Sequence, residues 1–158
     1  MRHVRLRTAG PTCFSFTILI IERERPLSES DVLGWHWLVD FFQCAKLPTE
    51  TAILESILVT AAQMAGATVV QSCFHKFSPY GLSGVVIIAE SHLAAHTWPE
   101  YYSMCIDLFS CSEKIQAQVA IDYIAERIQA EKVDQRHILR GNLLDYTLSR
   151  HRDAPPLP

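Results

Sequence analysis

The sequence predicts an α+β fold, a two-layer sandwich with two main helices on one face of a mostly antiparallel sheet. Two segments carry apolar residues at helical spacing, and short runs rich in β-branched and aromatic residues stand before, between and after them. The expected order is β-α-β-β-β-α-β. Two helices can cover only one face of such a sheet, so we expect a homodimer that packs sheet to sheet.

The length of the chain indicates one folded domain. The 158 residues are enough for one core and too few for two ordinary domains. We expect an N-terminal extension over residues 1–30, disordered or translated from a start codon assigned too early. The domain is expected over 31–148 and a flexible tail over 149–158. The apolar run "CFSFTILII" is far below the roughly 20 residues that a membrane helix needs, and no signal-peptide cleavage site follows it.

Local patterns justify each element of the domain. In chain order we expect a strand over 34–44, a helix over 48–67, strands over 67–77, 82–90 and 101–111, a helix over 112–132 and a strand over 133–141. The first strand combines aromatic and β-branched residues with partial alternation. The run over 82–90 is apolar on both faces, which predicts a buried strand.

Both expected helices carry an apolar stripe. The stripe of the first is Ile53, Ile57, Leu58, Ala61 and Met64. Pro48 and Thr49 lie at the start of this helix and Gly66 lies at its end, as start and stop signals require. The stripe of the second is Ile115, Val119, Ile124 and Ile128. Ser112 is its expected N-cap.

The net charge and the cysteine pattern exclude several classes of ligand and partner. A net charge of −3 offers no broad basic face for nucleic acid, so small or zwitterionic ligands are favoured and no membrane is expected. The five cysteines form no C-x-x-C pair and have no histidines at finger-like spacing, which argues against zinc and against a disulfide framework. An odd number of cysteines favours free thiols in a reducing cytoplasm. We therefore expect a cytoplasmic protein without a bound metal.

The stretch "IIAESHLAAHTWPE" carries the first chemical signal. Ser91 follows Glu90 at the end of an apolar strand, and His96 comes five residues later, past two alanines that leave room for a hairpin-like approach. A hydroxyl and an imidazole so close in sequence can form a nucleophile and proton-transfer pair. The spacing alone is weak, because a strand-end hydrogen bond explains it as well.

Other candidate residues also have simple structural explanations. Cys111 fits a small core residue, Phe77 fits a core aromatic, and Glu100 fits a solvated loop carboxylate. Taken singly, each residue is best explained by structure. Their occurrence together in one stretch of sequence favours a functional explanation.

That string resembles the short prokaryotic S-adenosylmethionine decarboxylase family, whose members are pyruvoyl-dependent enzymes made as proenzymes. The matching pieces are "FHKFSPYGLSGVVIIAESHLAAHTWPEY" and "IDLFSC", with weaker support from "GWHWLVDFF" and "AGATVV". The resemblance extends over roughly residues 34 to 145, and the motif around "ESHxxxHTWPE" is highly specific.

The resemblance implies self-cleavage between Glu90 and Ser91. Ser91 Oγ would attack the Glu90 carbonyl to give an ester, and β-elimination would then leave a pyruvoyl group at residue 91. His96 matches the family's processing histidine, and Ser83 matches a second serine that assists. The products would be a β chain over 1–90 and an α chain from residue 91.

The resemblance also implies the catalytic cycle. The pyruvoyl group would form a Schiff base with S-adenosylmethionine and accept the electrons left by CO2 loss. Cys111 matches the acid that returns a proton, Phe77 the adenine-stacking ring and Glu100 the carboxylate that binds the ribose. The family forms an (αβ)2 dimer with active sites between protomers, and its product is the aminopropyl donor for spermidine.

One departure from the family pattern bears on the substrate, and a second alternative is independent of it. Trp35 replaces the basic residue of the family's "GRH", on a strand near the expected pocket. Some relatives decarboxylate ornithine or arginine with the same machinery, so substrate identity is less secure than cofactor identity. A non-catalytic regulatory paralogue is the other alternative, although such a protein usually loses its serine or cysteine.

Overall fold

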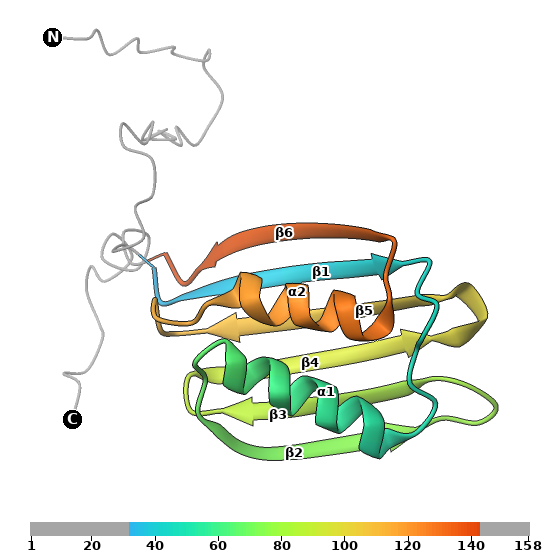
Figure 1. The fold of residues 1–158 in the computed structure, drawn as a ribbon. Coiled ribbons are helices and arrows are strands. Elements are labelled where there is room, and N and C mark those ends of the chain that lie inside the picture. The colour runs from blue at the N-terminus through green and yellow to red at the C-terminus, as the bar shows by residue number, and fades with distance from the viewer. Residues whose placement is uncertain (1–31, 143–158) are drawn as a thin grey trace, which may run out of the picture.

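A computed structural model describes residues 32–142, so the extension expected over 1–30 and the tail expected over 149–158 lie outside the described residues. The elements in chain order are β1 (Gly34–Phe42), α1 (Thr51–Met64), β2 (Val69–Lys76), β3 (Leu82–Ile88), β4 (Ser91–Trp98), the 3-10 helix η2 (Pro99–Tyr101), β5 (Ser103–Ser110), α2 (Ala117–Ile128) and β6 (Lys132–Arg140). The strand order in the sheet is β2-β3-β4-β5-β1-β6, and every neighbouring pair is antiparallel. Both helices lie on the same side of the sheet (Figure 1). The predicted α+β sandwich is confirmed.

The sheet contains one strand more than the predicted order. Residues 91–98 form β4 in the middle of the sheet, where the sequence pattern had indicated only a strand end and an approach to the next strand. The predicted start of the second helix was also wrong. That helix begins at Ala117, and Ser112 does not cap it, because the N-cap position is Gln116 and makes no side-chain hydrogen bond.

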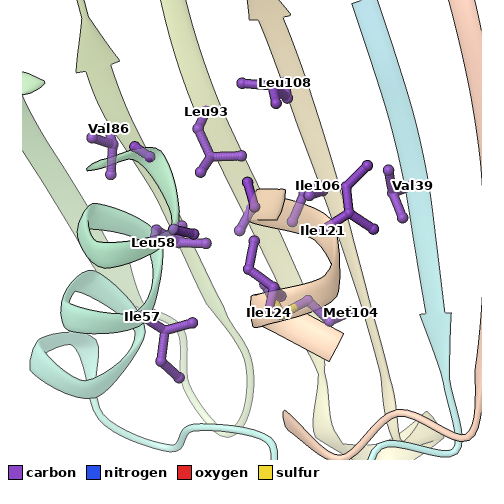
Figure 2. Packing of buried hydrophobic residues seen from close by; sticks show 14 of the residues in the cluster. Val39, Ile57, Leu58, Val86, Leu93, Met104, Ile106, Leu108, Ile121 and Ile124 are labelled. Carbon is purple, nitrogen blue, oxygen red and sulfur yellow. The ribbon is translucent and has the colours of Figure 1, made fainter. Parts of the chain in front are cut away.

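The core lies between the helices and the sheet. In α1 the buried residues include Leu54, Ile57 and Leu58, whereas Ile53 and Met64 of the predicted stripe are half exposed. Figure 2 shows Leu58 of α1 and Ile121 and Ile124 of α2 among the labelled side chains of β3, β4, β5 and β1. No helix in the described part of the chain is long and apolar enough to cross a membrane.

The face of the sheet away from the helices is open in the single chain. Ile87, on a strand predicted to be buried on both sides, is 43% exposed there because no helix covers that face. The alternation of the strands places apolar residues such as Leu38, Val85 and Ile87 on this open face together with a polar set: His36 and Asp40 on β1, Ser83 on β3, His92 and His96 on β4, and Cys105 and Asp107 on β5.

Leu58→Ala tests the core. Leu58 is fully buried, so we expect its truncation to lower the free energy of unfolding by about 2–5 kcal/mol. The matched control is Ile53→Ala, whose side chain on the same helix is 52% exposed and should change stability by less than about 1 kcal/mol. Urea unfolding followed by circular dichroism measures both. Equal losses in the two variants would contradict the assigned core.

Candidate active site

The Glu90–Ser91 peptide bond lies at the tight turn between β3 and β4. Ala89 and Glu90 form the turn, and Ile88 pairs with Ser91 across it. Two-residue hairpin turns usually contain glycine or asparagine, and neither is present here. The strain appears at Ser91, whose φ of 149° is one that side-chain-bearing residues rarely adopt.

Two backbone N–H groups hold Glu90, on the N-terminal side of this peptide bond. The Cys111 N–H donates to the Glu90 carbonyl oxygen at 2.9 Å, and the Thr68 N–H donates to the Glu90 carboxylate at 3.2 Å. Ser91 pairs with Ser110 on β5, one residue before Cys111. The fold therefore brings together three of the predicted site residues, Glu90, Ser91 and Cys111.

The Ser91 hydroxyl contacts His92 and not His96. The distance from Ser91 Oγ to His92 Nδ1 is 3.2 Å. Adjacent residues of a regular strand point to opposite faces, so this contact depends on the unusual backbone of Ser91. Sequence reasoning missed His92, because no pattern in the sequence reveals a positive φ.

The predicted processing pair Ser83 and His96 forms at the other end of the sheet. Ser83 Oγ and His96 Nδ1 are 2.7 Å apart on paired positions of β3 and β4. Because β4 is extended from Ser91 to Trp98, the Cα atoms of Ser91 and His96 lie about 16 Å apart at roughly 3.3 Å per residue. The predicted hairpin-like approach of His96 to Ser91 within one chain is therefore wrong.

The two predicted substrate-binding residues share the end that holds His96. Phe77 follows β2, is 49% exposed, and makes a T-shaped contact with His75, which pairs with Ser83. Glu100 is exposed on η2, directly after β4. The predicted site residues of one chain thus fall into two groups, the predicted half-sites, with Ser91 and Cys111 at one end of the sheet and His96, Ser83, Phe77 and Glu100 at the other.

His36 lies on the open face at the Ser91 end. Its ring contacts those of His92 and Phe109, with centroids 6.5 Å and 5.6 Å away. Arg140 Nη1 donates to His36 Nδ1 at 3.0 Å, which leaves the proton on Nε2, 3.6 Å from Asp107 Oδ1. Burial lowers the pKa of His36, and the nearby Arg140 and His92 lower it further. Asp107 raises this pKa but does not offset the other effects. His36 is therefore a neutral neighbour of His92.

The cysteines in the described part of the chain are free thiols, at Cys44, Cys73, Cys105 and Cys111. Burial, with Asp107 and Asp40 nearby, raises the pKa of Cys105 to about 11. Burial also raises the pKa of Cys44, whereas Cys73 and Cys111 are exposed. Within residues 32–142, no three side chains of His, Cys, Asp or Glu are grouped so that they could hold a metal ion.

Comparison with known proteins decides the family. The family model described as S-adenosylmethionine decarboxylase matches residues 35–141, about two thirds of the chain. The chain belongs to the S-adenosylmethionine decarboxylase family. The resemblance inferred from the motif is thereby confirmed.

Individual members of the S-adenosylmethionine decarboxylase family align over most of their length. An S-adenosylmethionine decarboxylase proenzyme from Acetivibrio thermocellus is 43% identical over 70% of this chain and 90% of its own. One from Moorella thermoacetica is 44% identical over 69% of this chain and 88% of its own. The crystal structure of the adenosylmethionine decarboxylase from Aquifex aeolicus superposes with a TM-score of 0.63 at 31% identity, covering 70% of this chain and 92% of that one.

Trp35, the departure from the usual family pattern, is buried and pairs with Ser110. It therefore lies one position from Cys111, at the half-site that contains Ser91.

The thiols should differ in reactivity. At pH 8, a thiol whose pKa is about 11 is ionised in only about one molecule in a thousand, and only the thiolate reacts with alkylating agents. We expect iodoacetamide to label Cys73 and Cys111 well before Cys105 and Cys44, as measured by peptide mass mapping after short exposures. If Cys105 were labelled as fast as Cys73, the buried environment and raised pKa of the Cys105 thiol would be wrong.

Proposed function

We propose that this chain is a self-cleaving S-adenosylmethionine decarboxylase proenzyme, a carboxy-lyase that generates its own pyruvoyl group at residue 91. The strained turn carries the proposal, because Ser91 has a φ of 149° next to the bond to be cut and the Glu90 carbonyl already accepts a backbone hydrogen bond. The names of the relatives, which include the word proenzyme, support the same activity.

The geometry at the turn suits an N-to-O acyl shift. Ser91 Oγ attacks the Glu90 carbonyl carbon, and negative charge develops on the oxygen that faces the Cys111 N–H at 2.9 Å. A backbone donor at this distance stabilises such an oxyanion, and one donor of this kind contributes about 3–4 kcal/mol. The C–N bond breaks as Ser91 nitrogen takes a proton. Loss of the Ser91 α-proton then expels the main-chain carboxylate of Glu90 and leaves a dehydroalanine. The dehydroalanine tautomerises to an imine, and its hydrolysis by water yields the pyruvoyl group and ammonia.

The residues around position 91 fit a pyruvoyl-dependent decarboxylation. When formed, the pyruvoyl group supplies an electron sink for the carbanion produced by CO2 loss. Cys111 follows Ser110, the β5 partner of residue 91, and its exposed thiol returns the proton to Cα of the substrate. Phe77 stacks on the adenine and Glu100 accepts hydrogen bonds from the ribose.

A second chain supplies the missing half-site. Two sheets stacked about a two-fold axis that runs across their strands place the Ser91 end of one over the His96 end of the other. Six strands of about eight residues give an open face on the order of 750 Å², close to the ~800 Å² per partner of stable interfaces. The (αβ)2 dimer therefore unites Ser91 and Cys111 of one protomer with His96, Ser83, Phe77 and Glu100 of the other.

The free thiols fit a reducing compartment, which supports a cytoplasmic location. The names of the relatives do not favour the ornithine or arginine alternative. The presence of Ser83, Ser91, His96 and Cys111 also speaks against a non-catalytic paralogue.

Mass measurement and a substrate panel test the activity. We expect denatured protein to consist of fragments 1–90 and 91–158, the second with a blocked, carbonyl-reactive end, and CO2 release from S-adenosylmethionine but not from ornithine or arginine. Ser91→Ala should stay intact, whereas Cys111→Ala should split yet turn over roughly 10²–10⁴ times more slowly. An unsplit wild-type chain, or CO2 from ornithine or arginine alone, would refute the proposal.

Mixed dimers test whether the site is shared between protomers. Ser91→Ala and His96→Ala chains, distinguished by different tags, should each stay uncut when expressed alone. On co-expression, the His96→Ala chain should be cut, because its Ser91 meets the intact His96 of its partner. Random pairing gives cutting of about half of these chains, since that fraction enters mixed dimers. If neither chain were cut in the mixture, His96 would not act across the interface.

A further inference from the structure

We propose that His92 is a catalytic residue of the self-cleavage, which orients the Ser91 hydroxyl and takes its proton in the first step. This inference rests on the proposed cleavage between Glu90 and Ser91. It assigns a task to the imidazole that lies at the nucleophile within the same chain, since His96 of that chain lies about 16 Å farther along β4.

The contact between Ser91 and His92 has the geometry of a general base. Ser91 Oγ lies 3.2 Å from His92 Nδ1, at the outer limit of hydrogen-bond reach for a proton transfer. In the neutral tautomer with the proton on Nε2, Nδ1 accepts a hydrogen bond from the hydroxyl. The φ of 149° at Ser91 allows the side chains of adjacent strand residues to meet.

Neighbouring rings hold the His92 imidazole in place. Phe109 on β5 lies 6.0 Å away at a tilt of 48°, and His36 on β1 lies 6.5 Å away in a T-shaped contact. On the other side, His92 is paired with Ile87 of β3. Because Arg140 donates to Nδ1 of His36, His36 stays neutral and does not repel a positive charge that forms on His92.

The proton balance of the step closes without any added reactant. The Oγ–C bond forms while the proton moves from Oγ to His92 Nδ1, and the C–N bond breaks while that proton passes to the Ser91 nitrogen. His92 then returns to its neutral state. The imidazole of His96, contributed by the other protomer, remains available for the later removal of the Ser91 α-proton.

His92→Phe separates this role from packing. Phenylalanine keeps a ring against His36 and Phe109 but has no nitrogen, so fragments should appear roughly 10²–10⁴ times more slowly in freshly made full-length chain. The control His137→Phe alters a ring that stacks on Trp37 of β1 at 4.7 Å, outside the site, and should split at the wild-type rate. Normal splitting of His92→Phe would overturn the inference.

Hydroxylamine identifies the step that is blocked, because at neutral pH it cleaves an ester but not a peptide bond. If His92 acts in the first step, no ester accumulates and hydroxylamine should release no fragments from His92→Phe. Release of fragments 1–90 and 91–158 would show that the acyl shift proceeds without His92 and would overturn the inference.

A second variant covers the case in which His92→Phe does not fold, as judged by circular dichroism and size-exclusion chromatography. His92→Asn places an amide oxygen near the position of Nδ1, which can accept the hydrogen bond but not the proton, so it should also split slowly. Wild-type splitting of folded His92→Asn would exclude proton transfer to His92. Ser91→Ala tests the proposed cleavage site separately. If Ser91→Ala splits, the cleavage between Glu90 and Ser91 is misassigned. If Ser91→Ala stays intact while His92→Phe splits normally, only the role of His92 is contradicted.

Discussion

The fixed rise per residue of an extended strand sets the distance between Ser91 and His96 on β4, and this distance determines how the predicted site residues are arranged. Five residues separate Ser91 from His96, and in a strand they span about 16 Å. The residues of the family motif are therefore divided between two ends of one sheet. The same sheet leaves one face without helices. The proposed dimer would cover that face and would bring the two groups of predicted site residues together.

Strain at the Ser91 end is sustained by the surrounding ladder. A residue with a side chain held at such a φ costs of order 1–3 kcal/mol, and it persists only where its neighbours determine its position. Here the β3–β4 pairing, the Cys111 N–H on the Glu90 carbonyl and the Thr68 N–H on the Glu90 carboxylate all hold the turn. Cleavage at this bond would release the strain, which favours the cut chain over the intact one.

The sequence was sufficient for the two helices and for five of the six strands, because their apolar periods are clear. Strand β4 was missed because "SHLAAHTW" interleaves histidine and alanine, which are weak strand formers, on a strand whose polar side faces no helix. The motif predicted Ser91, His96 and Cys111 as one set of site residues. It could not show which of them are in contact, since contacts depend on register and, at His92, on a backbone angle that no sequence pattern reports.

The polar character of the open face bears on how two such faces would meet. A hollow of about 210 Å³ is lined by Asp40, Asp107 and Arg136 among others. Asp107 also lies 3.6 Å from the neutral His36, which Arg140 contacts from its other side. Burying unpaired charges is costly, so charges on two facing sheets penalise alignments that leave them without partners. In the proposed dimer these groups would therefore fix the register in which the Ser91 end of one protomer meets the His96 end of the other, and burial of Ile87 and its apolar neighbours would supply the affinity.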